Sequence, residues 1–260
     1  MSQSPALFLH VPKTAGTTLR EIINRQFRPD LVYAVYDTDP AFHGLDDLKR
    51  LTPEQWSGLR VVLGHLDYGV AAWAPPESRF VTLLREPHDR VISLYHHQMT
   101  LYRSPEQRLA IPDHIVGRKM IQCDNHQTRI LSGENPDFGG CRQSMLDRAI
   151  ENMETRFDVV GLTERFDESL LLMCAAFDWV IPYYAEENVS VGRPPRDQFD
   201  GDDLAVIAEY NQLDMQLYQY AVRRLDNEIA DRGHDFAREV QLFVDKNRSY
   251  AGLLRPKVSW

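Results

Sequence analysis

The segment that most constrains the fold runs from Ala6 to Phe27. An apolar run at residues 6–11 predicts a short β-strand, Pro12 interrupts it, and small residues follow as far as Gly16. Apolar residues then recur at helical spacing up to Phe27. Strand, loop and helix in this order predict an α/β fold in which the loop leads into the N-terminus of a helix.

The loop has the composition of a phosphate cradle. Small residues allow successive backbone N–H groups to converge on an anion, and the helix adds the positive end of its dipole. In the loop of nucleotide triphosphatases a lysine directly follows the second glycine, whereas here Thr17 follows Gly16 and Lys13 stands at the loop's entrance. We therefore expect the loop to bind a phosphate group. Because the lysine is not where nucleotide triphosphatases have it, ATP or GTP hydrolysis is not the default reaction.

The composition suits one globular domain covering residues 1–260. Of the 260 residues, 43% are hydrophobic and 26% are charged. Apolar runs are far shorter than the ~20 residues that cross a bilayer, and residues 1–5 are too short and too polar for a secretion signal. We expect a cytoplasmic protein without stable membrane insertion. Three widely spaced cysteines predict reduced thiols and no zinc site.

The net charge of −9 bears on the partners of the protein. A protein that binds a long polyanion such as DNA, RNA or heparan sulfate usually presents a basic face, and this chain is acidic overall. We therefore expect no nucleic-acid partner, and a neutral or small acceptor is favoured over a long anionic polymer.

Further strands and helices complete the predicted architecture. Residues 31–36, 59–65, 79–85 and 157–162 have strand patterns, and most of the segments between them have helical ones. The sequence thus predicts a P-loop-like three-layer α/β fold, in which a central parallel sheet is flanked by helices. From about residue 202 onward the pattern is helical, with apolar residues at helical spacing.

Two polar residues stand at the ends of predicted strands. His65 ends the strand at 59–65, and Arg85 ends the strand at 79–85. Open parallel sheets bind ligands beyond the carboxyl ends of their strands. Pro87 suits the first position of the next helix, and Ser93 lies about two turns into it, so that Arg85 and Ser93 can approach one phosphate.

These motifs resemble those of a known family. Residues 10–18 (HVPKTAGTT) are similar to the 5'-phosphosulfate-binding loop of sulfotransferases that use 3'-phosphoadenosine 5'-phosphosulfate (PAPS), in the branch of carbohydrate 2-O- and 6-O-sulfotransferases. Residues 85–95 resemble the family's 3'-phosphate-binding motif. Asn125, Gln127 and Arg129 resemble an Asn-x-Gln-x-Arg segment of the glycan branch.

The resemblance implies a PAPS-dependent sulfotransferase that acts on a hydroxyl acceptor, a sugar or a small molecule, and releases 3',5'-adenosine bisphosphate. Arg85 and Ser93 would hold the 3'-phosphate, and Lys13 would stabilise the departing bisphosphate. His65 would be the general base. The 5'-phosphosulfate would be held by Lys13, Thr14, Ala15, Gly16, Thr17 and Thr18. No metal is required.

Several interpretations stay open at this point. A histidine at a strand end is often only structural, and His10 and Asp67 are reserve candidates for the base. Asn125, Gln127 and Arg129 are as well suited to helix packing as to substrate contact. The sequence has no late Arg-Lys-Gly segment that would close over the nucleotide, and Arg193 or Arg196 is the candidate for that place. The rival functions are a magnesium-dependent kinase with a variant loop and a nucleotide-binding protein without turnover.

Overall fold

The computed structural model describes residues 4–36, 41–101, 109–184 and 194–253. Residues 251–253 are described without their side chains. Arg193 lies outside the described residues. The strands are β1 (Ala6–Leu9), β2 (Val32–Val35), β3 (Val61–Gly64), β4 (Arg79–Leu84) and β5 (Phe157–Leu162). The helices are α1 (Gly16–Gln26), α2 (Leu45–Lys49), α3 (Pro53–Gly58), α4 (Pro87–Thr100), α5 (His126–Ser132), α6 (Gln143–Arg156), α7 (Phe166–Phe177), α8 (Gly201–Tyr210) and α9 (Gln212–Leu253).

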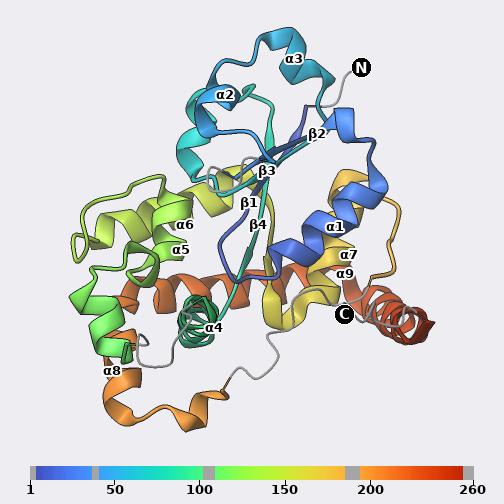
Figure 1. Ribbon diagram of the computed structural model, residues 1–260. Helices are drawn as coiled ribbons and strands as arrows, with labels where there is room; N and C mark the ends of the chain where they lie inside the picture. The colour runs from blue at the N-terminus through green and yellow to red at the C-terminus, as the bar shows by residue number, and fades with distance from the viewer. Residues whose placement is uncertain (1–3, 37–40, 102–108, 185–193, 254–260) are drawn as a thin grey trace.

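The five strands form one parallel sheet in the order β2-β3-β1-β4-β5. All four residues of β1 and all four of β3 are buried, as expected for strands with helices on both faces. Figure 1 shows α1 and α7 on one side of the sheet and α5 and α6 on the other. The predicted α/β class, with a central parallel sheet between helices, is confirmed.

The strand order places a switch point between β1 and β4. From β1 the chain continues toward β2, whereas from β4 it continues toward β5 on the opposite side. Such a reversal opens a crevice at the carboxyl ends of the two strands, where α/β proteins bind their ligands. The loop at residues 10–16 follows β1, and Arg85 follows β4. The fold therefore brings the two predicted phosphate motifs to one place.

The C-terminal region is helical, as the pattern from about residue 202 predicts. Helix α9 runs across the molecule above α4 and α8 in Figure 1 and bends at Gly233, whose φ of 73° interrupts the helix. Its first half packs on α6, α5 and β5 through the buried side chains of Leu217, Ala221 and Leu225. This helix therefore packs along the β5 edge of the sheet and against the helices α5, α6 and α7.

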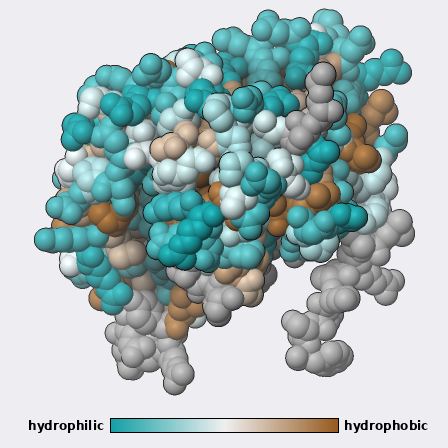
Figure 2. All heavy atoms as spheres, turned by 90° about the horizontal axis from the view of Figure 1, so that it is seen from above, coloured by the Kyte–Doolittle hydropathy of each residue, from teal (hydrophilic) through white to brown (hydrophobic). Residues whose placement is uncertain are grey.

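Two further expectations can be compared with the structure. Cys123, Cys141 and Cys174 are all free, as the sequence predicts. Within residues 4–253, leaving aside the undescribed stretches, no helix is long and apolar enough to cross a membrane. The face of the molecule in Figure 2 is mainly hydrophilic, with apolar residues in small groups.

Candidate functional site

The loop after β1 has the backbone geometry of an anion-binding nest. Lys13 and Ala15 adopt left-handed conformations, with φ of 73° and 61°. These angles are unfavourable for residues with a Cβ, and such strain is concentrated at functional sites. Helix α1 begins at Gly16, so Gly16, Thr17 and Thr18 form its first turn and their N–H groups have no partner within the helix. The loop therefore presents converging donors and the positive end of a helix.

The side chain of Thr14 takes part in holding the loop. It is fully buried, and its hydroxyl donates to the carbonyl oxygen of Val11 at 2.8 Å. Of the predicted loop ligands, Thr14 is thus suited to contribute its backbone N–H, whereas the half-exposed Thr17 has a side chain near solvent.

The end of β4 lies against this loop. The Arg85 guanidinium donates through Nη1 to the carbonyl oxygen of Lys13 at 3.0 Å. Ser93 lies on α4 and is 3% exposed. Glu86 caps α4 by accepting from the Asp89 N–H at 2.8 Å, and Pro87 occupies the first helical position as predicted. The structure thus brings Arg85 to the phosphate loop, although helices α1 to α3 and strands β2 to β4 separate the two in the sequence.

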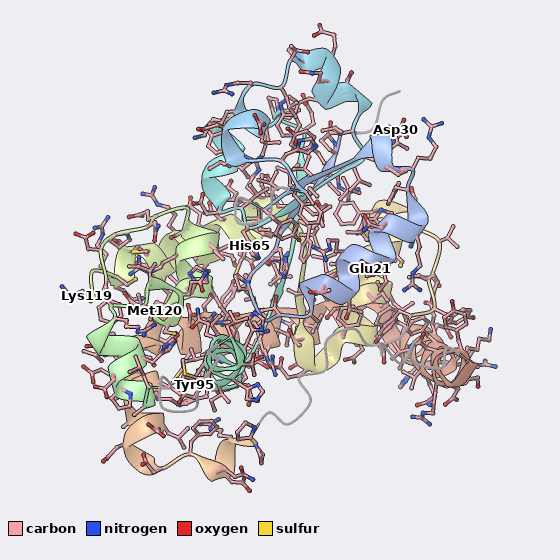
Figure 3. All side chains as sticks on the ribbon, viewed as in Figure 1. Glu21, Asp30, His65, Tyr95, Lys119 and Met120 are labelled. Atoms are coloured by element: carbon pink, nitrogen blue, oxygen red, sulfur yellow. The ribbon has the colours of Figure 1, made fainter. Side chains whose placement is uncertain are left out.

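His65 stands at the carboxyl end of β3, next to the same loop. The backbone N–H of His65 donates to the carbonyl oxygen of Val35 at 3.1 Å. Gly64 permits this close approach because it has no Cβ, and a Cβ there would lie 1.9 Å from the same oxygen. The side chain is exposed. Figure 3 shows it near the middle of the molecule, between the α5–α6 pair and α1. His65 is therefore fixed through its backbone, and its exposed ring packs against the rings of His10 and Tyr36.

A second histidine lies directly behind His65. The rings of His10 and His65 are 5.0 Å apart between centroids, because β1 and β3 are paired with Leu9 opposite Gly64. His10 Nδ1 lies 2.9 Å from the Tyr36 hydroxyl, and the His10 ring touches Gly16 so closely that a Cβ there would be 1.9 Å from Nε2. The ring thus fills the space between the phosphate loop and His65.

Burial decides which of these histidines can act as a base. It lowers the pKa of His10 to about 3, with smaller contributions from the nearby charges of His65, Arg20 and Lys13. A group with so low a pKa is a weak base at neutral pH. Asp67, the other reserve candidate, uses a carboxylate oxygen to accept from the Gly69 N–H at 2.8 Å. Burial thus argues against His10, and the choice of His65 over Asp67 as the base stays a prediction.

The Asn-x-Gln-x-Arg segment opens α5 and lies close to Arg85. Both polar atoms of the Gln127 side chain bond to the backbone of Arg85. Arg129 is 2% exposed and pairs with the Asp124 carboxylate, and the Asn125 Oδ1 accepts from the N–H groups of Leu213 and Asp214. The contacts of these three residues are internal, and substrate contact by them stays a prediction.

The segment before α8 also reaches the site. Arg196 forms an ion pair with Glu86, Nη1 to Oε1 at 3.4 Å, directly beside Arg85. The predicted role of Arg193 over the nucleotide is untested. In the described part of the chain, no group of three or more His, Cys, Asp or Glu side chains is placed to hold a metal ion.

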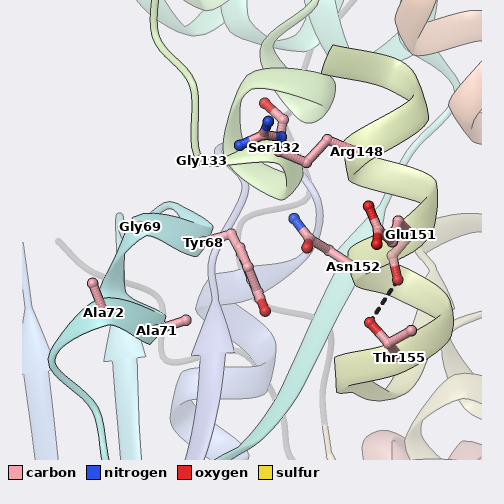
Figure 4. Close-up of a pocket in the computed structure, with 10 residues that line it drawn as sticks. All are labelled: Tyr68, Gly69, Ala71, Ala72, Ser132, Gly133, Arg148, Glu151, Asn152 and Thr155. Atoms are coloured by element: carbon pink, nitrogen blue, oxygen red, sulfur yellow. Dashed lines mark hydrogen bonds between the residues drawn. The ribbon is translucent and has the colours of Figure 1, made fainter. Parts of the chain in front are cut away.

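A cavity of about 400 Å³ lies elsewhere, between the 3-10 helix Tyr68–Ala72, the end of α5 and α6 (Figure 4). Tyr68 in its wall packs on Phe80 and Phe157, near the amino ends of their strands. None of the predicted site residues lines this cavity. It is therefore distinct from the candidate site.

The sequence did not reveal Tyr36, Arg20 or Asp214 as parts of the site. The Arg20 guanidinium lies 5.4 Å from the centre of the Tyr36 ring, and Asp214 holds the N-terminus of α5. Tyr36 lies there because β2 pairs with β3, and Asp214 because α9 docks on α5, whereas Arg20 is on α1, directly after the loop.

Comparison with known proteins places the chain in a family. The family model described as galactose-3-O-sulfotransferase matches residues 2–253. The structure of mouse sulfotransferase SULT7A1 complexed with PAP is similar over 82% of this chain, with 14% identity and a TM-score of 0.39, and this chain spans 66% of the length of that one. A search of curated proteins found no match. Because the family model covers nearly the whole sequence, this chain belongs to the galactose-3-O-sulfotransferase family.

Proposed function

We propose that this protein transfers the sulfuryl group of PAPS to a hydroxyl of a carbohydrate. Family membership supports the reaction class. The observation that carries the proposal is the contact between the two phosphate motifs, in which Arg85 Nη1 donates to the Lys13 carbonyl at 3.0 Å. One bound nucleotide can therefore contact both motifs at the switch point between β1 and β4.

The residues present fit such a cofactor. The strained loop and the first turn of α1 offer backbone donors to a 5'-phosphosulfate. Arg85 offers a planar two-pronged donor, and Ser93 a hydroxyl, to a 3'-phosphate. When bound, PAPS supplies the sulfuryl group and leaves as 3',5'-adenosine bisphosphate.

Two side chains of the chain are assigned chemical roles. Lys13 places its positive charge beside the phosphate loop, where negative charge grows on the leaving group. His65 accepts the proton of the acceptor hydroxyl, and its exposed ring is open to that hydroxyl. The neutral state of His10 suits this role, because a second cation 5.0 Å away would oppose protonation of His65.

The family points to galactose as the acceptor sugar and to its 3-hydroxyl as the attacking group. This is a finer statement than the sugar or small molecule that the sequence predicts. The absence of a nucleic-acid partner and the cytoplasmic location stay predictions from the sequence.

The acceptor is tested by incubating the protein with PAPS labelled at sulfur and a panel of β-galactosides, with and without EDTA. We expect label on galactosides with a free 3-hydroxyl, none on the matched 3-O-methyl galactosides, and no loss of rate with EDTA. Equal labelling of the 3-O-methyl compounds would exclude the 3-hydroxyl. Phosphoryl transfer from ATP that requires magnesium, with none from PAPS, would instead support the kinase.

A further inference from the structure

The side chain of Gln127 is bonded to the backbone of Arg85 on both sides. The Arg85 N–H donates to Gln127 Oε1, and Gln127 Nε2 donates to the Arg85 carbonyl, each at 2.9 Å. Gln127 is fully buried. β4 ends at Leu84, so the amide of Gln127 fixes the peptide groups before and after Arg85 where sheet pairing has stopped. The direction in which the Arg85 side chain leaves the backbone is thereby set.

Gln127 is itself held by the C-terminal helix. The buried Asp214 of α9 accepts from the Gln127 N–H at 3.0 Å, and from the N–H and hydroxyl of Thr128 at 2.7 and 2.8 Å. The start of α5 is therefore anchored on α9. Through Gln127 this anchor reaches Arg85, whose guanidinium in turn touches the carbonyl of Lys13.

We propose that Gln127 is a positioning residue for Arg85. By holding Arg85 in place, it gives the site its preference for a nucleotide that carries a 3'-phosphate. The inference rests on the proposed function, because it assumes that Arg85 binds that phosphate. It assigns Gln127 a role through the protein rather than in contact with the acceptor. Both of its polar side-chain atoms already have protein partners.

The two hydrogen bonds between the Gln127 side chain and the backbone of Arg85 form a clamp, and this clamp requires a side-chain amide. A glutamate would still accept from the Arg85 N–H, but it could not donate to the Arg85 carbonyl, and a buried carboxylate would attract the Arg85 guanidinium away from a phosphate. Gln127→Glu thus keeps the size of the side chain and breaks one half of the clamp. Gln127→Ala removes both halves.

The experiment is calorimetric titration with 3',5'-adenosine bisphosphate and with AMP, which differ only in the 3'-phosphate. The wild type should prefer the bisphosphate, and both variants should lose about 10-fold or more of that preference, with AMP affinity nearly unchanged. Thr128→Val is the matched control: it removes one bond to Asp214 and leaves the Arg85 contacts, so its thermal midpoint should fall while its preference stays. If Gln127→Ala does not fold, the near-isosteric Gln127→Glu carries the test.

Each outcome has one meaning. An unchanged preference in the folded Gln127 variants overturns the inference, and so does an equal loss in Thr128→Val, which would point to general loosening of α5. A wild type that binds AMP and the bisphosphate equally would overturn the proposed function itself, together with the role of Gln127.

Discussion

Replacement of His65 by alanine is expected to lower kcat about 10²- to 10⁴-fold, the range typical of a lost general base. The affinity for 3',5'-adenosine bisphosphate should stay within about two-fold, because the loop and Arg85 contacts are untouched. The exposed ring packs beside His10 and Tyr36 without filling the core, so the variant should fold. Steady-state transfer rates and calorimetric titration measure the two effects.

Controls separate this role from simple packing. His234→Ala removes another exposed histidine, on α9, and should leave kcat unchanged. Added imidazole should restore part of the activity of His65→Ala if the missing group is a base. Full activity in His65→Ala, or a large loss of bisphosphate affinity, would contradict the assignment.

Replacement of Gly16 by alanine is expected to destabilise the protein and to weaken bisphosphate binding strongly. The new Cβ would lie 1.9 Å from His10 Nε2. The His10 ring is 8% exposed, bonded to Tyr36 and stacked on Phe8, so it has little room to move. Overpacking of this kind costs about 1–3 kcal/mol. A displaced first turn of α1 should also weaken bisphosphate binding, because its N–H groups would no longer converge on the phosphate.

Thermal unfolding and titration measure both consequences. Gly58→Ala is the matched control, since a Cβ at Gly58 meets no atom within 4 Å. In a His10→Ala background the substitution Gly16→Ala should cost less stability than in the wild type, because the clashing ring is gone. A Gly16→Ala protein that melts and binds like the wild type would show that the loop tolerates the extra atom.

Much of the fold could be predicted from the sequence because local patterns determine it. The apolar runs ending near His65 and Arg85 predict buried parallel strands, and Pro87 marks the start of α4 as the structure has it. The strand–loop–helix segment predicts the nest at Lys13 to Gly16, although not which residues adopt positive φ.

The contacts across the site could not be predicted in the same way. His10 lies beside His65 only because the register pairs Leu9 with Gly64, and a single chain pattern does not specify the partner of each strand. Asp214 follows Leu213 in a helical pattern and resembles an ordinary surface acid, yet it is fully buried at the start of α5. The pairing of Gln127 with Arg85 depends on that same docking.

The central claim is that the crevice between β1 and β4 binds the PAPS nucleotide through both phosphate motifs. The most direct test is calorimetric titration of the protein with 3',5'-adenosine bisphosphate and with ADP, in EDTA and then in magnesium. We expect the bisphosphate to bind much more tightly than ADP without metal. Equal binding of the two nucleotides, or binding that appears only with magnesium, would contradict the claim.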